Sequence, residues 1–131
     1  MPVTRLALTA LLALLALLPA AAQTVPAPES QRLAQELRQL IGPARCSSDS
    51  QCRVLPVGAK ACGGPAAYWA WSTQGTDEKR LTELAARQAE AQRHELQASG
   101  RLSNCALVTA PAVACVAQTC QIQARPAGDA S

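Results

Sequence analysis

The chain has 131 residues and a formal net charge of +3, and aromatic residues make up 2% of it. This length fits one small domain. The basic residues are spread along the chain without a cluster, which gives no support for nucleic-acid binding. Because the sequence contains no Phe, its core must be built mostly from smaller side chains and can bury little area. Covalent cross-links are therefore expected to supply part of the stability.

The first 22 residues contain the three parts of a Sec export signal in the right order. Arg5 supplies a positive charge, residues 6–18 form an apolar run, and small residues follow up to Ala22. The run is shorter than the roughly 20 apolar residues that a membrane span needs. We therefore expect residues 1–22 to be a signal peptide that is cleaved near Ala22. The mature protein is expected to be periplasmic or secreted, with no attachment to a membrane.

A helix is predicted after a flexible leader at residues 23–29. Ser30 is the expected N-cap, because its hydroxyl can accept from a free backbone N–H in the first turn. Four apolar residues then recur at helical spacing on one face: Leu33, Leu37, Leu40 and Ile41. Gly42-Pro43 ends the helix. This face predicts packing against the core, and a partner-binding face is the alternative.

A strand and a second helix are predicted in the middle of the chain. Residues 53–57 favour a strand in which Pro56 occupies an edge or a bulge, since proline cannot donate to a ladder. Residues 66–72 fit either a strand or a helix. A helix is then expected from Thr76 or Asp77 to about residue 98, with Gly100 as its stop.

The last third predicts three strands, at residues 105–108, 113–116 and 120–123. The last two are expected to form a hairpin in which Cys115 and Cys120 face each other. Residues 126–131 are expected to be a disordered tail. The predicted fold is a single disulfide-rich α+β domain at residues 30–125, with two helices and a small antiparallel sheet.

Six cysteines follow the predicted signal: Cys46, Cys52, Cys62, Cys105, Cys115 and Cys120. An even set in a small exported domain predicts disulfides, which removes these residues from catalysis and metal binding. Zinc ligands usually come in pairs with two to four intervening residues, and only Cys115/Cys120 approaches that spacing. We expect three disulfides, no metal and no cofactor, while the spacing leaves the pairing open.

Candidate catalytic groups are few. His94 is the only histidine, so a Ser-His or Cys-His site would have to use it. It lies in a polar helix between Arg93 and Glu95, where a surface histidine is the ordinary expectation. Asp49 is expected to cap backbone N–H groups in the turn between two cysteines. These residues predict a protein that is not an enzyme.

Two features could form a binding surface: the turn Gly63-Gly64-Pro65 and the tryptophans Trp69 and Trp71. Paired indole rings can stack on a saccharide or anchor a protein partner. Alternatively, Tyr68 and one tryptophan fill the core, an interpretation we favour because the chain has no other bulky side chains.

The cysteine framework with its neighbours, C-x5-C-R-V-x-P-V-G-x3-C-G-G-P-x2-Y followed by C-x9-C-x4-C, resembles that of a group of small exported bacterial proteins. The resemblance covers nearly the whole chain after the predicted signal. It implies export and the cysteine framework, and it implies no activity.

The sequence as a whole predicts an exported, non-enzymatic protein that acts by binding an unknown protein or saccharide partner. The first alternative is a periplasmic inhibitor of a hydrolase, which would insert the rigid Gly63-Gly64-Pro65 turn into an active-site cleft. The second alternative is a small hydrolase that uses His94.

Overall fold

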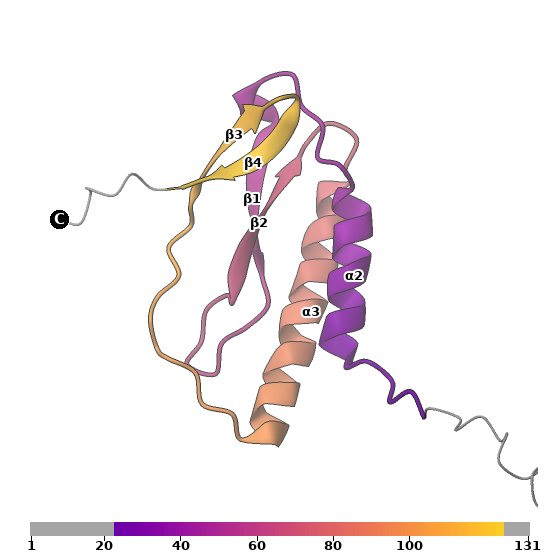
Figure 1. Ribbon diagram of the computed structural model, residues 1–131, viewed down its shortest axis with the longest axis vertical. Helices are drawn as coiled ribbons and strands as arrows, with labels where there is room; N and C mark the ends of the chain where they lie inside the picture. Colours follow the sequence, from indigo (N-terminus) through magenta and orange to yellow (C-terminus); the bar gives the residue numbers. More distant parts are fainter. Residues whose placement is uncertain (1–22, 125–131) are drawn as a thin grey trace, which may run out of the picture.

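The computed structural model describes residues 23–124 (Figure 1). The predicted signal peptide at 1–22 and the predicted tail at 126–131 lie outside the described residues. The elements follow in the order α2 (Glu29–Ile41), η2 (Asp49–Gln51), β1 (Cys52–Val57), β2 (Ala67–Ser72), α3 (Glu78–Ser99), β3 (Ala112–Val116) and β4 (Thr119–Gln123). The fold is α+β, as predicted.

The elements form three layers, with the β1–β2 ribbon between the helix pair and the β3–β4 hairpin (Figure 1). β1 and β2 pair antiparallel from Cys52↔Ser72 to Val57↔Ala67. β3 and β4 pair antiparallel from Ala112↔Gln123 to Val116↔Thr119. The expected small sheet is therefore divided into two ribbons, each of two strands. Pro56 is accommodated because β1 has a strand partner on one side only.

The main core lies between the helices and one face of the β1–β2 ribbon. Its buried members come from both helices and both strands: Leu33, Leu37, Leu55, Val57, Trp71, Leu81, Leu84 and Ala85. Because side chains of a strand alternate between faces, the odd-numbered residues of β1 and β2 share the helix-facing side. The predicted apolar face of the first helix is confirmed as a core face.

The helix ends confirm one prediction and correct another. Asp77 is the N-cap of α3, where its side chain accepts from the backbone N–H of Arg80, and Gly100 ends the helix with a positive φ. Ser30 is not the N-cap of α2, which begins one residue before it with Pro28 as the cap. The reason is that the Ser30 hydroxyl and backbone N–H both bind the Glu95 carboxylate on α3.

The aromatic residues lie on β2, so the strand alternative is the correct one for this segment. Trp71 is a core residue with 3% exposure, and Trp69 is half-buried against the same core. Tyr68 projects from the opposite face, across from Pro56, and belongs to neither core cluster. The expected core role is thus confirmed for one tryptophan and wrong for Tyr68.

The predicted strand at residues 105–108 is wrong. Residues 101–111 have no regular secondary structure and form a mostly exposed connection along the outside of the molecule (Figure 1). Leu107, which the strand prediction places in a sheet, is 94% exposed. The segment runs past the ribbons without pairing to either of them, so its β-forming side chains have no sheet face to cover.

The predicted C-terminal hairpin is confirmed, including the register that sets Cys115 opposite Cys120. Its two-residue turn consists of Ala117 and Gln118, with φ angles of 50° and 60°. Positive φ at both central residues gives the turn the twist that a tight hairpin needs.

Candidate functional site

The connection between β1 and β2, residues 58–66, carries the predicted turn and is held firmly at its base. We call it the braced loop. The backbone N–H of Gly58 donates to Gln88 Oε1 at 2.8 Å, and that of Ala59 donates to Gln92 Oε1 at 2.8 Å. At the other end, Ala66 N–H donates to Val57 O at 3.0 Å. α3 thus orients the loop through two glutamine side chains.

The tip of the braced loop is an exposed turn with its own internal hydrogen bonds. Lys60 N–H donates to Gly64 O, and Gly63 N–H donates to Lys60 O, both at 3.0 Å. Gly63 and Gly64 have φ angles of 94° and 78°, and no neighbouring atom lies within 4 Å of a Cβ placed at either. Glycine is needed here for backbone conformation, because space is open around both residues.

A disulfide between Cys62 and Cys105 ties this loop to the 101–111 connection. Both cysteines are exposed. Lys60 adds a second tie, because its Nζ donates to Ala106 O at 2.6 Å. Two irregular segments are therefore fixed relative to each other at one end of the molecule.

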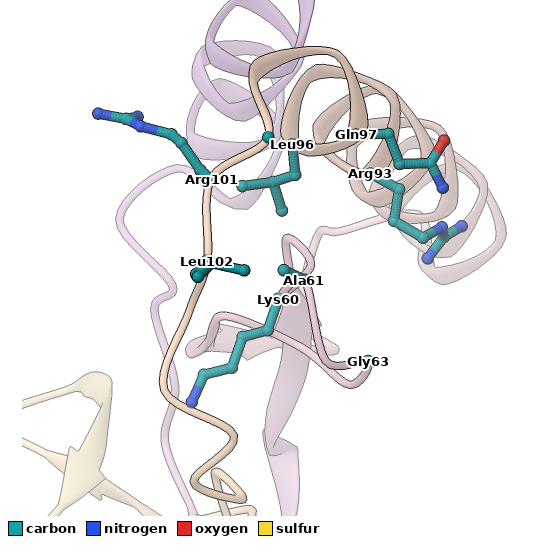
Figure 2. A pocket seen from close by; sticks show the side chains of 9 residues that line it. Lys60, Ala61, Gly63, Arg93, Leu96, Gln97, Arg101 and Leu102 are labelled. Carbon is teal, nitrogen blue, oxygen red and sulfur yellow. The ribbon is translucent and has the colours of Figure 1, made fainter.

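A pocket of about 300 Å³ lies between the braced loop, the last turns of α3 and the start of the 101–111 connection (Figure 2). Its lining combines apolar and cationic side chains with no carboxylate: Lys60, Ala61, Gly63, Arg93, Leu96, Gln97, Gly100, Arg101 and Leu102. Figure 2 shows Leu96, Leu102 and Ala61 around the central space, with Arg93 to one side. The side chains of Arg101 and Lys60 extend away from that space. The pocket could not be recognised from the sequence, because the three segments that line it are separated along the chain.

The two tryptophans do not join the turn in one surface. Trp71 is buried, so it is removed from the predicted binding surface. Trp69 lines a separate cavity of about 230 Å³ with Ile41 and Gly42 at the end of α2. The Arg38 guanidinium lies over its ring, 4.1 Å from the centroid, in a cation–π contact.

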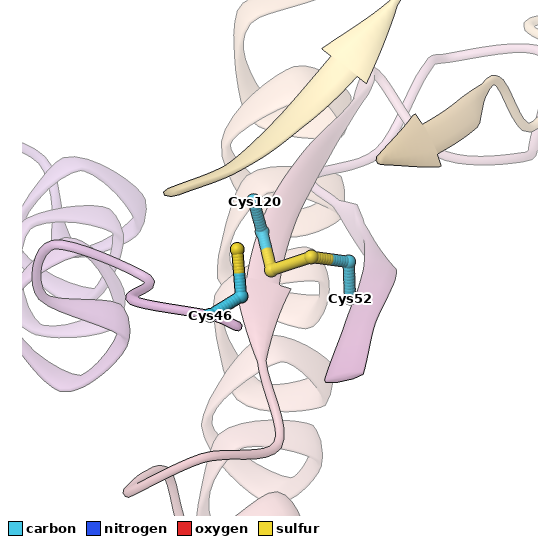
Figure 3. Close-up of side chains that lie close together, drawn as sticks. All are labelled: Cys46, Cys52 and Cys120. Carbon is cyan, nitrogen blue, oxygen red and sulfur yellow. A yellow bond between two sulfur atoms is a disulfide. The ribbon is translucent and has the colours of Figure 1, made fainter. Parts of the chain in front are cut away.

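The other four cysteines form two adjacent disulfides, Cys46–Cys115 and Cys52–Cys120. Cys115 and Cys120 face each other on the hairpin, yet each bonds to a cysteine that flanks η2. The Sγ atoms of Cys46, Cys52 and Cys120 lie within 4.8 Å of one another in a buried cluster (Figure 3). Every sulfur in it is held in a disulfide, so the cluster offers no thiolate to a metal ion.

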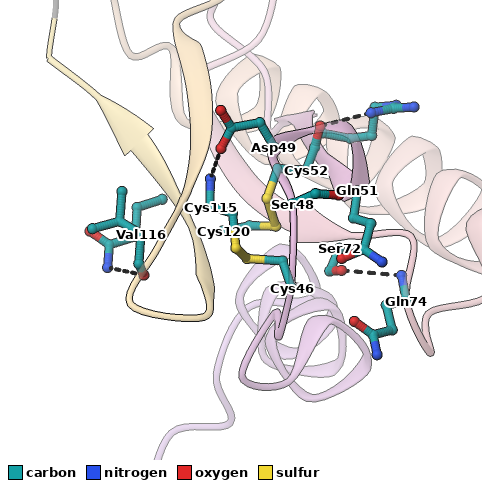
Figure 4. The surroundings of a disulfide bond; sticks show 12 residues. Cys46, Ser48, Asp49, Gln51, Cys52, Ser72, Gln74, Cys115, Val116 and Cys120 are labelled. Atoms are coloured by element: carbon teal, nitrogen blue, oxygen red, sulfur yellow. Dashed lines mark hydrogen bonds between the residues drawn. A yellow bond between two sulfur atoms is a disulfide. The ribbon is translucent and has the colours of Figure 1, made fainter.

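Asp49 does not cap its own turn as the sequence predicts, but binds a backbone N–H on the distant strand β3. Its Oδ1 accepts from the backbone N–H of Cys115 at 2.7 Å (Figure 4). The contact adds a hydrogen bond beside the Cys46–Cys115 disulfide and fixes the hairpin against η2.

His94 lies on the exposed side of α3, with 71% of its side chain accessible and its Nε2 3.0 Å from Glu90 Oε1. Arg93 donates to the same carboxylate and lowers the pKa of Glu90 below its ordinary value. The described residues contain no free cysteine. His94 therefore has a surface carboxylate as its partner and no thiol to activate.

Comparison with known proteins finds no matching family model, no matching curated protein and no matching solved structure. Within residues 23–124, neither helix has the combined length and apolar character that crossing a membrane requires.

Proposed function

We propose that this chain is an exported, non-enzymatic protein that binds a protein partner through the tip of the braced loop. The observation that supports this most is the combination of an exposed glycine turn with fixation by a disulfide, two glutamines of α3 and internal hydrogen bonds. A loop that is ordered before binding loses less conformational entropy when the partner docks.

Export is supported by two independent features. Residues 1–22 have the pattern of a Sec signal, and the domain carries three disulfides. Disulfides persist in oxidising compartments outside the cytoplasm. A periplasmic or secreted location fits both.

A protein partner is favoured over a saccharide because the tryptophans are poorly placed for stacking on a sugar. Trp71 is buried in the core, and Arg38 covers one face of the half-buried Trp69 ring. Stacking recognition needs an open ring face.

The second candidate function, inhibition of a hydrolase, is supported by the shape of the tip. Gly63 and Gly64 carry no side chains and are exposed, and no atom lies within 4 Å of a Cβ placed at either, so the backbone of the tip is accessible. Such a turn can enter an active-site cleft as a preordered segment. The alternative in which the chain is itself a hydrolase that uses His94 has less support, since His94 is exposed and pairs with Glu90.

Affinity capture with paired glycine variants tests the proposal. Gly64→Asn places a side chain on the tip, whereas Gly75→Asn makes the same change at another exposed glycine with positive φ. The wild type and Gly75→Asn should capture the same protein from a periplasmic extract, and Gly64→Asn should capture markedly less of it. Equal capture by both variants, or no specific capture, contradicts the proposal. If the captured protein is a hydrolase, its inhibition by the wild type supports the second candidate.

A further inference from the structure

We propose that the two buried disulfides form a thiol-triggered switch, in which Cys46–Cys115 and Cys52–Cys120 exchange for Cys46–Cys52 and Cys115–Cys120 inside the folded domain. The present pairing ties the β3–β4 hairpin to the segments that flank η2, and the exchanged pairing removes both ties. This goes beyond the proposed function, since the braced loop takes no part in it. Three features carry it: the spacing of the sulfur atoms, the register of the hairpin, and the hydrogen bonds that dock the hairpin.

The sulfur atoms of the two disulfides lie within reach of each other. The Sγ atoms of Cys46, Cys52 and Cys120 are all within 4.8 Å of one another. Figure 3 shows the Cys46 sulfur beside the Cys52–Cys120 bond. A thiolate exchanges with a disulfide by direct attack on one of its sulfur atoms. A thiolate at Cys46 therefore has its target next to it, and a small side-chain rotation brings the reacting atoms into contact.

The hairpin places Cys115 and Cys120 where they can bond to each other, because they are directly opposite in the register of β3 and β4. Neither backbone N–H is used between them. The Cys115 N–H donates to Asp49 Oδ1 (Figure 4). The Cys120 N–H donates to Ala44 O. The two cysteines therefore form a non-hydrogen-bonded pair, in which opposite Cα atoms are about 4.5 Å apart. That separation is within the roughly 4.4–6.8 Å that disulfides span.

Backbone hydrogen bonds hold the hairpin in place independently of the disulfides. The backbone N–H of Cys46 donates to Gln118 O at 3.1 Å. One residue earlier, Arg45 forms an isolated β-bridge with Thr119. Because these contacts involve no sulfur, they persist when one disulfide opens. The freed thiolate then stays beside the second disulfide, and the exchange needs no unfolding.

A small aliphatic thiol starts the exchange and is regenerated at its end. Its thiolate attacks Cys115 Sγ, the less buried end of its disulfide, and Cys46 leaves as a thiolate. Cys46 then attacks Cys52 Sγ, which forms the Cys46–Cys52 bond and expels Cys120 as a thiolate. Cys120 attacks Cys115 Sγ, closes the Cys115–Cys120 bond and releases the small thiolate. Two protein disulfides are present before and after, so no oxidant or reductant is consumed.

The exchange changes what holds the hairpin to the domain. The present disulfides join residues that are 69 and 68 positions apart in the chain. In the exchanged pairing each disulfide closes only a short loop, and short loops constrain the unfolded chain less. The hairpin is then held by hydrogen bonds and packing alone. The exchanged form should therefore release its hairpin at a lower denaturant concentration than the present form.

Two single-cysteine variants test the central step. Cys115→Ser leaves a thiol at Cys46, and Cys120→Ser leaves one at Cys52, each next to an intact disulfide. After incubation of the folded protein at neutral pH, the free thiol is alkylated and located by peptide mapping. The label should appear on Cys46 and Cys120 in the first variant, and on Cys52 and Cys115 in the second. Both variants should keep the helical circular dichroism spectrum, because the main core contains no cysteine.

Cys105→Ser is the matched control, because it leaves a thiol at Cys62 outside the buried cluster. The label should stay on Cys62 alone in this variant. Label confined to Cys46 in Cys115→Ser and to Cys52 in Cys120→Ser overturns the proposal. Label spread over the buried cysteines in Cys105→Ser also overturns it, because the exchange is then not confined to the cluster.

The wild type tests the complete switch. A small amount of glutathione should produce peptides joined by Cys46–Cys52 and by Cys115–Cys120. The rate should rise about tenfold per pH unit below the pKa of the glutathione thiol, because the thiolate is the attacking species. If only the present pairing is found, the switch is refuted even where the variants exchange. Capture by the braced loop is measured separately with Gly64→Asn, so each proposal can fail alone.

Discussion

Gln88 is a buried polar residue that connects three parts of the molecule, so its replacement should be costly. Its side chain is on α3 and the residue is only 5% exposed. Oε1 accepts from the buried backbone N–H of Gly58 at 2.8 Å, and Nε2 lies 3.5 Å from the backbone oxygen of Ser30. One amide group thus links α3 with the braced loop and with α2.

Gln88→Leu keeps the approximate size of the side chain and removes both hydrogen bonds. The Gly58 N–H then stays buried without an acceptor, which costs about 1–3 kcal/mol, and the added apolar burial offsets only part of it. We expect the free energy of unfolding to fall by about 2 kcal/mol, which corresponds to a decrease in Tm of roughly 10 °C for a domain of this size. Denaturant and thermal unfolding with the disulfides intact, followed by circular dichroism, measure both quantities.

Gln35→Leu is the matched control, because Gln35 is an exposed glutamine on α2. Its effect should stay within about 0.5 kcal/mol, as for most surface substitutions. If Gln88→Leu unfolds no more easily than Gln35→Leu, the reasoning about the buried amide is refuted.

Three further predictions follow from burial and backbone geometry. Under limiting reductant, alkylation should trap Cys62 and Cys105 first, because their disulfide is exposed while the other two are largely buried; peptide mapping that finds other cysteines first contradicts this. In tryptophan fluorescence, the Trp69→Phe variant, which retains the buried indole of Trp71, should emit at a shorter wavelength than Trp71→Phe. The reverse order would contradict the assignment of Trp71 to the core. Gly58→Ala should lower stability by about 2 kcal/mol, because φ is +75° there and a Cβ would overlap Gln92 Oε1; an unchanged Tm would show that the loop base adapts freely.

The helices were predictable because their information is local. Leu33 and Leu37 on one helix, and Leu81 and Leu84 on the other, repeat at helical spacing and are buried. Gly100 marks a helix end through a backbone conformation that glycine adopts readily. The hairpin belongs to the same class, since its two strands are neighbours in sequence.

The incorrect or open predictions concern contacts between distant segments. Residues 105–108 have side chains typical of a strand, but a strand needs a partner, and the segment has none in either ribbon. Disulfide pairing stayed open because Cys46 and Cys115 are 69 residues apart. Gln88 is indistinguishable from its polar neighbours in sequence, and only the packing of α2 and the braced loop shows that it is buried.

The candidate site was predicted only in part. The Gly63-Gly64 turn was recognisable from its composition, because consecutive glycines indicate unusual backbone angles. Arg101 and Leu102 carry no sequence signal of a pocket. They acquire that role because the Cys62–Cys105 disulfide brings their segment against the braced loop.

The order of the disulfides along the chain has a consequence for how the protein matures. Cys46 and Cys52 pair with the last two cysteines, whereas Cys62 pairs with the next cysteine after it. If the chain is exported from its N-terminus, as proposed, Cys46 and Cys52 arrive long before their native partners, and oxidation on arrival can join them to each other. Native pairing then requires that these two thiols stay reduced or that thiol–disulfide exchange rearranges the first bond. A chain that ends before β3 cannot form either buried disulfide, so the native disulfides can be completed only after the C-terminal hairpin has been made.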